Sequence, residues 1–168
     1  PEYLRNKLLK SLASLGVAIL ITGSNNKIDL QIKKEIPEAT NIYNFIGETS
    51  LEEYFALSQL SLGYIGMDTL NMHIAASYNK PIFAIFGSTK LSMWSPWSNN
   101  LQKGTKDNKP MQVYDNITIF QSSLPCNVCG VIGCGDIHGR DEFKFSIKPE
   151  DIFNSVEKWY KKNKNIKC

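Results

Sequence analysis

Apolar and polar residues alternate along the chain in a pattern that predicts strands and helices in turn. Short apolar runs, each ending in glycine, are expected to form buried strands at 17–23, 41–47, 61–66 and 81–87. Helical spacing of apolar residues lies at 3–15, at 27–36, from Ser50 onward and at about 69–78. Ser50 and Glu53 have the spacing of a capping box, which starts a helix. Strict alternation of this kind argues for an α/β fold, a parallel sheet with helices on both faces.

The pattern changes after Gly87. Residues 88–112 are rich in Ser, Asn, Lys, Pro and Trp, and we expect a long surface excursion there. A further strand is predicted at 113–120, and Pro149 is suited to the first turn of a last helix. The sequence contains no internal repeat and no low-complexity linker, so a single domain is predicted over all 168 residues.

Composition narrows the class of protein. A chain of 168 residues with 42% hydrophobic residues can bury a core without disulfides or metals. Its longest apolar run, 17–21, is far below the roughly 20 residues of a membrane-spanning helix. The net charge of +3 arises mainly in the last eight residues. The sequence shows no basic face interleaved with aromatic residues, so nucleic-acid binding is not predicted. Four unevenly placed cysteines favour a reducing cytoplasm over a secreted disulfide framework.

Glycine and small polar residues follow three of the predicted strands, at the edge where parallel sheets bind ligands. These strand ends are Gly23-Ser24-Asn25, Gly66 to His73, and Gly87-Ser88-Thr89. In the second, Asp68 and Thr69 lie where a strand passes into a helix, so the first N–H groups of that helix can bind an anion. His73 lies one turn further along and can add a donor to a diphosphate.

The same residues also have a simpler interpretation, which stays open. Asp or Thr before a helix commonly serves only as an N-cap, and a single half-buried His is commonly structural. The sequence has neither a G-x-G-x-x-G motif nor a P-loop, so it predicts neither a nicotinamide cofactor nor a P-loop nucleotide site.

Three blocks of sequence occur in an order that is informative as a set. The first, GMDTLNMHIAASYNKPIFAIFGSTKLSMWSP, is similar to a signature of Asp-Thr/Ser-Gly, His and an Ala-rich helix, followed by a proline-led strand. Upstream, IGETSLEEYFALSQLS is similar to a Gly-x-Thr-x-Leu-x-Glu segment, and downstream lies the cysteine loop PCNVCGVIGCGD. From about Leu15 to the C-terminus the chain therefore resembles glycosyltransferase family 9, the lipopolysaccharide heptosyltransferases, and in particular their heptosyltransferase III-like branch.

The resemblance implies a GT-B architecture of two Rossmann-like halves, with this chain as the C-terminal half that binds the nucleotide-sugar donor, usually ADP-heptose. The absence of Met before Pro1 agrees with a trimmed piece, and the N-terminal acceptor domain would be missing. The resemblance assigns the diphosphate to Asp68, Thr69, Leu70, Asn71 and His73. Thr49 would lie near the adenosine. Gly23, Ser24, Gly87, Ser88 and Thr89 would complete the donor site.

In the family, the sugar is transferred with inversion to a hydroxyl of the lipopolysaccharide core. The carboxylate base belongs to the N-terminal half, so no catalytic residue is assigned in this chain, and the chain alone is expected to be inactive. The acceptor would be bound through the missing domain. The resemblance implies a cytoplasmic enzyme at the inner face of the bacterial inner membrane, with peripheral membrane association. No cofactor and no metal ligand are assigned in this chain.

Two features depart from the family pattern. Leu70 stands where the family has Gly, and a leucine side chain there is expected to narrow the phosphate site or weaken binding. The cysteines Cys126, Cys129 and Cys134 have part of the spacing of a zinc site, with His138 or Cys168 as a fourth ligand, but Phe143 stands near a position where the branch has a further Cys. Metal binding, a disulfide and free thiols all remain open.

A different class of function is the alternative. The chain would then be a non-catalytic Rossmann-like binding module that uses the cysteine loop and the aromatic segment Trp94, Pro96 and Trp97 to bind a partner. Against this, Trp and Pro in a long loop commonly pack back onto the sheet.

Overall fold

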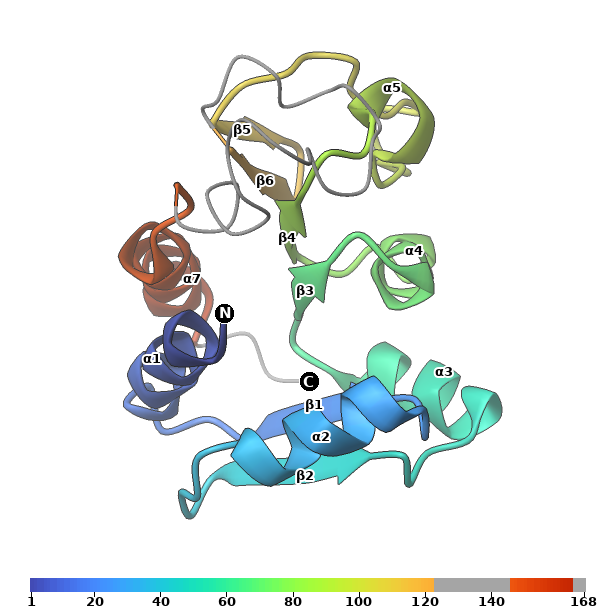
Figure 1. Cartoon of the computed structure of the whole chain (residues 1–168). Coiled ribbons are helices and arrows are strands. Elements are labelled where there is room, and N and C mark those ends of the chain that lie inside the picture. The colour runs from blue at the N-terminus through green and yellow to red at the C-terminus, as the bar shows by residue number, and fades with distance from the viewer. Residues whose placement is uncertain (123–145, 165–168) are drawn as a thin grey trace, which may run out of the picture. The chain divides into compact units, whose positions relative to one another are not determined.

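The computed structural model describes residues 1–122 and 146–164 (Figure 1). The elements are α1 (Glu2–Ala13), β1 (Ile19–Gly23), α2 (Lys27–Glu35), β2 (Ile42–Ile46), α3 (Leu51–Leu60), β3 (Tyr64–Met67), α4 (Leu70–Ser77), β4 (Ile82–Phe86), α5 (Leu91–Trp94), β5 (Met111–Tyr114), β6 (Ile117–Gln121) and α7 (Pro149–Asn163). The chain divides into two compact units. The first comprises residues 1–57 and α7, and the second begins at Ser58 and includes the elements from β3 to β6.

The first unit is built on two parallel strands, β1 and β2, with Ile19 opposite Ile42. Helix α2 packs against β2, and α1 packs against α7. Asn41, just before β2, binds the turn between α1 and β1, because its Nδ2 donates to the carbonyl oxygens of Ala13 at 2.9 Å and Val17 at 2.8 Å. These contacts explain why the loop between α2 and β2 returns to the start of β1.

The predicted capping box of α3 is confirmed. The backbone N–H of Ser50 donates to Glu53 Oε2 at 2.7 Å, and the N–H of Glu53 donates to Ser50 Oγ at 3.2 Å. This reciprocal pair satisfies donors that a helix start leaves unpaired.

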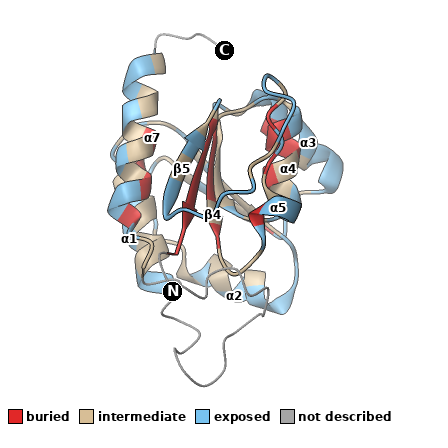
Figure 2. Cartoon of the chain, turned by 90° about the horizontal axis from the view of Figure 1, so that it is seen from above, coloured by how far each residue is buried: buried red, intermediate tan, exposed pale blue. Residues whose placement is uncertain are grey.

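The second unit holds a four-stranded sheet in the order β3-β4-β6-β5, in which the first three strands are parallel. Helix α4 packs against β3 and β4, and Figure 2 shows β4 among the most buried elements. The buried cluster joins one face of α4 to one face of the sheet and contains Met72, Ala75, Ala76, Ile82, Ala84, Phe86, Leu91, Ile117 and Ile119. Parallel strands flanked by helices confirm the predicted α/β class.

The prediction of a single strand at 113–120 is wrong. That segment is a hairpin, in which β5 runs antiparallel to β6 and the chain turns at Asp115 and Asn116. Asp115 has φ of 52°, a left-handed conformation that Asp tolerates better than most residues. Hydrogen bonds from Asn100 and Ser98 hold the pKa of Asp115 below its usual value. The turn therefore reverses the chain and adds an edge strand to the sheet.

The predicted surface excursion at 88–112 is partly ordered into elements. It contains the short helix α5 and the start of β5, and its middle is pinned to the hairpin. Ser98 Oγ donates to Asp115 Oδ2 at 2.6 Å, and Ser95 Oγ donates to the carbonyl of Thr105 at 3.0 Å. The segment is thus built into the second unit.

Candidate anion-binding turn at the carboxyl edge of the sheet

The turn from β3 into α4 carries the residues that the sequence singled out most clearly. Strand β3 ends at Met67, Thr69 occupies the N-cap position and α4 begins at Leu70. The N–H of Asp68 donates to the carbonyl of Ile85 at 3.3 Å, which ties the turn to the end of β4. The helix N-terminus therefore opens at the carboxyl edge of the parallel strands, where ligands of such sheets bind.

The N-cap interpretation of Thr69 is only partly met. Its backbone is extended, with φ of −146° and ψ of 171°, as an N-cap requires, but its side chain makes no capping hydrogen bond. Within the described residues, neither the Asp68 carboxylate nor the His73 imidazole has a hydrogen-bond partner, although both side chains are half-buried. Half-buried polar groups of this kind are suited to a ligand.

The neighbouring strand end adds a second orphaned group. Strand β4 ends at Phe86 and is followed by Gly87, Ser88 and Thr89, all half-buried. The Oγ1 atom of Thr89 is buried and has no hydrogen-bond partner among residues 1–122 and 146–164. No atom of the described part of the chain lies within 4 Å of the position that a Cβ atom of Gly87 would take, so these residues leave space beside this glycine. Since β3 and β4 are adjacent and parallel, the structure brings these residues to the same edge as the β3–α4 turn.

Tyr64 is a residue of this turn that the sequence analysis missed. Its hydroxyl donates to the carbonyl of Met67 at 2.9 Å and lies 3.4 Å from Thr69 Oγ1. Burial raises the pKa of this phenol, and the nearby Asp68 carboxylate acts in the same direction. A Cβ atom on Gly66 would lie 2.4 Å from the phenol oxygen, so glycine is needed for the ring to reach the turn. The signal in the sequence was a tyrosine two residues before a glycine on one strand face.

Replacing Tyr64 with phenylalanine is therefore expected to loosen the turn. The change removes one hydrogen bond to Met67, which costs about 0.5–1.5 kcal/mol of folding free energy. Amide hydrogen exchange should become faster at 67–70 and stay unchanged in β1 and β2. Unaltered exchange at 67–70 would show that the phenol does not hold the turn.

The predicted residues Gly23, Ser24 and Thr49 belong to the first unit. There, both donors of Ser24 are engaged, because its N–H and its Oγ lie 2.8 and 2.9 Å from Asp29 Oδ2. Asp29 is in the first turn of α2, and its own N–H donates to Asn26 Oδ1 at 2.8 Å. Thr49 is half-buried directly before the capping box of α3. At the end of β1, the hydrogen-bond donors of Ser24 are therefore already bound by a carboxylate of the chain itself.

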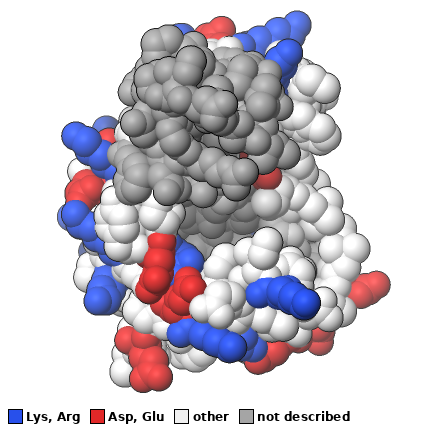
Figure 3. All heavy atoms as spheres, viewed as in Figure 1, with Lys and Arg blue, Asp and Glu red and all other residues white. Residues whose placement is uncertain are grey.

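Other predicted features have different outcomes. Cys126, Cys129, Cys134, His138, Phe143 and Cys168 lie outside the described residues. Among 1–122 and 146–164, no cluster of three or more His, Cys, Asp or Glu could hold a metal ion. In the same ranges, no helix has the length and apolar character needed to cross a membrane. Figure 3 shows acidic and basic residues intermixed on the face in view.

The aromatic segment divides into an inner and an outer part. Pro96 is buried, as expected of a loop that packs back onto its unit, whereas Trp94 and Trp97 are each 50% exposed. The expectation that this segment packs back onto the sheet therefore holds for Pro96 and not for the two tryptophans.

The parallel strands, the flanking helices and the open helix N-terminus define a Rossmann-like α/β protein. The family model of glycosyltransferase family 9 (heptosyltransferase) matches residues 1–122, and the chain belongs to this family. The resemblance drawn from the sequence is thereby confirmed.

Individual relatives agree with the family. The chain is 31% identical to lipopolysaccharide heptosyltransferase 3 of Escherichia coli over 97 residues. The aligned residues cover 56% of this chain and 28% of that protein. It is 30% identical over 103 residues to lipooligosaccharide heptosyltransferase 2 of Haemophilus influenzae, covering 59% and 30%. The solved structure of E. coli ADP-heptose LPS heptosyltransferase II shares the fold, with a TM-score of 0.64 and 18% identity over 98% of this chain and 42% of that one. The chain thus spans less than a third of these curated relatives.

Proposed function

We propose that this chain is the donor-binding half, a single nucleotide-sugar-binding domain, of an inverting glycosyltransferase that transfers heptose from ADP-heptose to the lipopolysaccharide core. Family membership supports the class of enzyme. The observation that carries the donor role is the β3–α4 turn, where a helix N-terminus without a side-chain cap adjoins the half-buried His73. In this proposal the N–H groups of the first helical turn and the His73 imidazole bind the diphosphate.

The residues of the turn differ in chemistry, so we assign them to different groups of the nucleotide sugar. A carboxylate repels a diphosphate, so we assign Asp68 to hydroxyl groups of the sugar rather than to phosphate oxygens. The Thr89 hydroxyl is buried and has no partner within the part of the chain that the structure describes, so it is suited to a phosphate oxygen or a sugar hydroxyl. The helix N-terminus would stabilise the charge that develops on the departing diphosphate. Gly23, Ser24 and Thr49 remain predicted contacts, and Ser24 would first have to exchange Asp29 for the ligand.

The rest of the reaction lies in other parts of the enzyme in this proposal. The resemblance puts the carboxylate base and the acceptor site in a separate N-terminal domain, at the inner face of the bacterial inner membrane. This chain alone is then expected to bind donor without transferring sugar, because base and acceptor are not held near the donor.

The donor role is tested by thermal unfolding of the chain with ADP, ADP-heptose and adenosine. A ligand that binds only the folded state stabilises it by about 2.7 kcal/mol at a hundred times its Kd. We expect both diphosphates to raise the Tm and adenosine to leave it almost unchanged. No shift with either nucleoside diphosphate would overturn the proposal.

Replacing Leu70 with glycine is expected to tighten ADP binding several-fold. The Leu70 side chain is 60% exposed at the first position of α4, where a phosphate would approach the backbone. The variant should also lose about 1 kcal/mol of stability, because glycine is a poor helix former. Calorimetric titration of ADP measures the first effect and chemical denaturation the second. Weaker binding by a folded variant would mean that leucine contributes a contact instead of an obstacle.

A further inference from the structure

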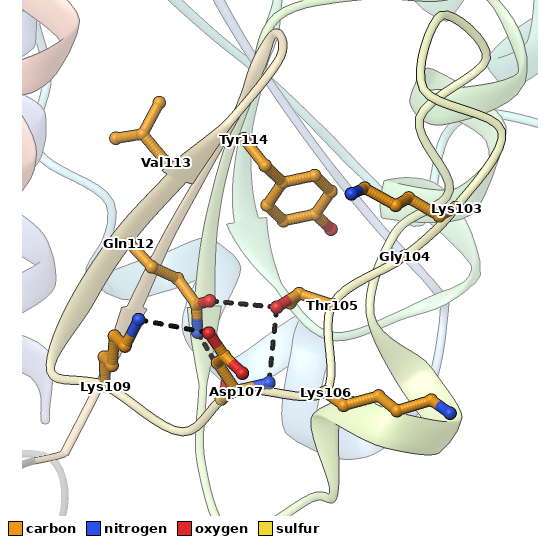
Figure 4. Close-up of a pocket in the computed structure, with 9 residues that line it drawn as sticks. All are labelled: Lys103, Gly104, Thr105, Lys106, Asp107, Lys109, Gln112, Val113 and Tyr114. Carbon is orange, nitrogen blue, oxygen red and sulfur yellow. Dashed lines mark hydrogen bonds and ion pairs between the residues drawn. The ribbon is translucent and has the colours of Figure 1, made fainter.

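The second unit contains a pocket of about 350 Å³ away from the β3–α4 turn, which we call the lysine pocket (Figure 4). One loop and one strand line it: Lys103, Gly104, Thr105, Lys106, Asp107, Lys109, Gln112, Val113 and Tyr114. This volume lies at the lower end of the range for small-molecule sites and is suited to a ligand of about one sugar ring with a substituent.

Hydrogen bonds fix the walls of the lysine pocket. Thr105 Oγ1 donates to Gln112 Oε1 at 3.1 Å, and Gln112 Nε2 donates to the carbonyl of Asp107 at 2.8 Å, so the loop is tied to β5. Behind the loop, a Cβ atom on Gly104 would lie 2.4 Å from Ser95 Oγ, which explains the glycine at this close approach. A ligand would therefore meet a wall that is already ordered, which lowers the entropic cost of binding.

The lysine pocket carries a surplus of positive charge. Lys109 Nζ lies 3.0 Å from Asp107 Oδ2 and is neutralised by it. Lys103 and Lys106 have no ion-pair partner within the described residues. No Asp or Glu occurs in the sequence between Asp68 and Asp107. Figure 4 shows Lys103 extending toward the Tyr114 ring and Lys106 extending outward at the rim. Two unpaired ammonium groups favour a ligand with an anionic group.

The remaining lining is suited to a saccharide. The Tyr114 phenol is held in place because its hydroxyl donates to the carbonyl of Pro96 at 2.6 Å. Burial raises the pKa of this phenol. Figure 4 shows this ring next to the Lys103 side chain, with the Asp107 carboxylate and the Gln112 amide in another part of the pocket lining. An aromatic surface with a few convergent polar groups is a typical lining for a small polar ligand.

One end of the pocket loop lies at the same edge of the sheet as the β3–α4 turn. The N–H of Gln121, the last residue of β6, donates to the carbonyl of Pro110 at 2.9 Å, so the pocket loop reaches the carboxyl edge of β6. Strand order separates β5 from β3 by three strand spacings, about 14 Å in total. Between them, Gln121 Oε1 is buried and has no hydrogen-bond partner in the described ranges, and Gln121 Nε2 lies 3.4 Å from Asn108 Oδ1 of the loop. A second ligand could therefore bind beside the donor without overlapping it.

We propose that the lysine pocket binds a saccharide bearing an anionic group, phosphate or carboxylate, with Lys103 contacting the anion and Tyr114 the sugar ring. This saccharide is a ligand additional to the acceptor, which the proposed function places in a separate N-terminal domain, so this proposal does not depend on the donor role. A phosphorylated sugar and a sugar carboxylate differ only in the group that carries the negative charge. In both, the sugar ring and the anionic group contribute to binding.

The test is an NMR titration of the isotopically labelled chain with glucose 6-phosphate, glucuronate, glucose and inorganic phosphate. We expect the first two to shift the amides of Thr105, Asp107 and Gln112, and to bind about ten-fold more tightly than glucose or phosphate. Lys103→Gln should weaken their binding about ten-fold, the loss of one charge-assisted hydrogen bond. Lys90→Gln, an exposed lysine outside the pocket, is the matched control and should change nothing.

Several outcomes would overturn the proposal. Equal affinity for glucose and glucose 6-phosphate would remove the role of the lysines, and equal affinity for phosphate alone would remove the sugar. Shifts confined to Leu70–His73 would place the anion at the helix N-terminus instead. ADP is titrated separately: shifts in the lysine pocket with glucose 6-phosphate but none anywhere with ADP would refute the donor role and leave the pocket standing.

Discussion

Replacing His73 with alanine is expected to weaken ADP binding by about ten- to a hundred-fold. The imidazole is half-buried one helical turn from Thr69 and has no hydrogen-bond partner within the described residues. A hydrogen bond to a charged phosphate contributes about 1.5–3 kcal/mol, which corresponds to that range of affinity. Isothermal titration of ADP into the folded variant measures the change directly.

The matched control for this variant is Ser77→Ala at the other end of the same helix. Ser77 is exposed and its Oγ donates to the carbonyl of Ile74 at 2.7 Å, so its loss perturbs α4 without touching the turn. ADP affinity should be the same as in the unmodified chain. If His73→Ala binds ADP as tightly as the control, the imidazole does not contact the diphosphate, and its role in the turn is structural.

The parts of the fold that are determined by neighbouring residues could be predicted from the sequence. The reciprocal bonds of Ser50 and Glu53 depend on spacing alone, and the end of α2 at Glu35 follows from Pro37, which disfavours helix in the residue before it. The start of α4 at Leu70 likewise follows from the abrupt change between a strand and a helical pattern.

The hairpin of β5 and β6 could not be predicted in the same way. Residues 111–121 are apolar at most positions on both sides of the turn, and Asp115-Asn116 is the one pair of consecutive polar residues among them. That pair lacks the glycine of the common hairpin turns. It becomes a turn because Asn116 Nδ2 reaches the carbonyls of Asn79 at 2.9 Å and Lys80 at 2.8 Å, in a segment far along the chain. Tertiary contacts, not local propensity, decide the reversal.

The candidate site shows the same division. The position of Thr69 at the start of α4 was evident from the sequence, but the contact from Tyr64 was not, because it depends on the ring passing over Gly66. At the end of β1, the sequence predicts Ser24 as a ligand contact, whereas in the structure its N–H and hydroxyl are hydrogen-bonded to Asp29, five residues later. Whether a hydrogen-bond donor is available to a ligand depends on the positions of neighbouring side chains, which local sequence patterns do not determine.

Replacing Phe86 with alanine is expected to lower the free energy of unfolding of the second unit by about 3–5 kcal/mol. Phe86 is fully buried, at 0% exposure, in the cluster that joins α4 to the sheet, so its loss leaves a cavity that Met72 and Ile119 cannot fill. Hydrogen exchange should show lost protection in β4 and β6. Val113→Ala, on the exposed side of β5, is the control and should change stability by no more than about 0.5 kcal/mol.

This variant also tests whether the two compact units are stabilised separately. If they are, amides in β1 and β2 keep their protection while those of β4 and β6 lose it, because the cavity lies in the second unit. Equal loss in all four strands would mean that the chain unfolds as one cooperative body. Phe86 directly precedes Gly87, so in the first case ADP binding should also weaken, since the strand end beside the β3–α4 turn loses its anchor while the first unit stays folded.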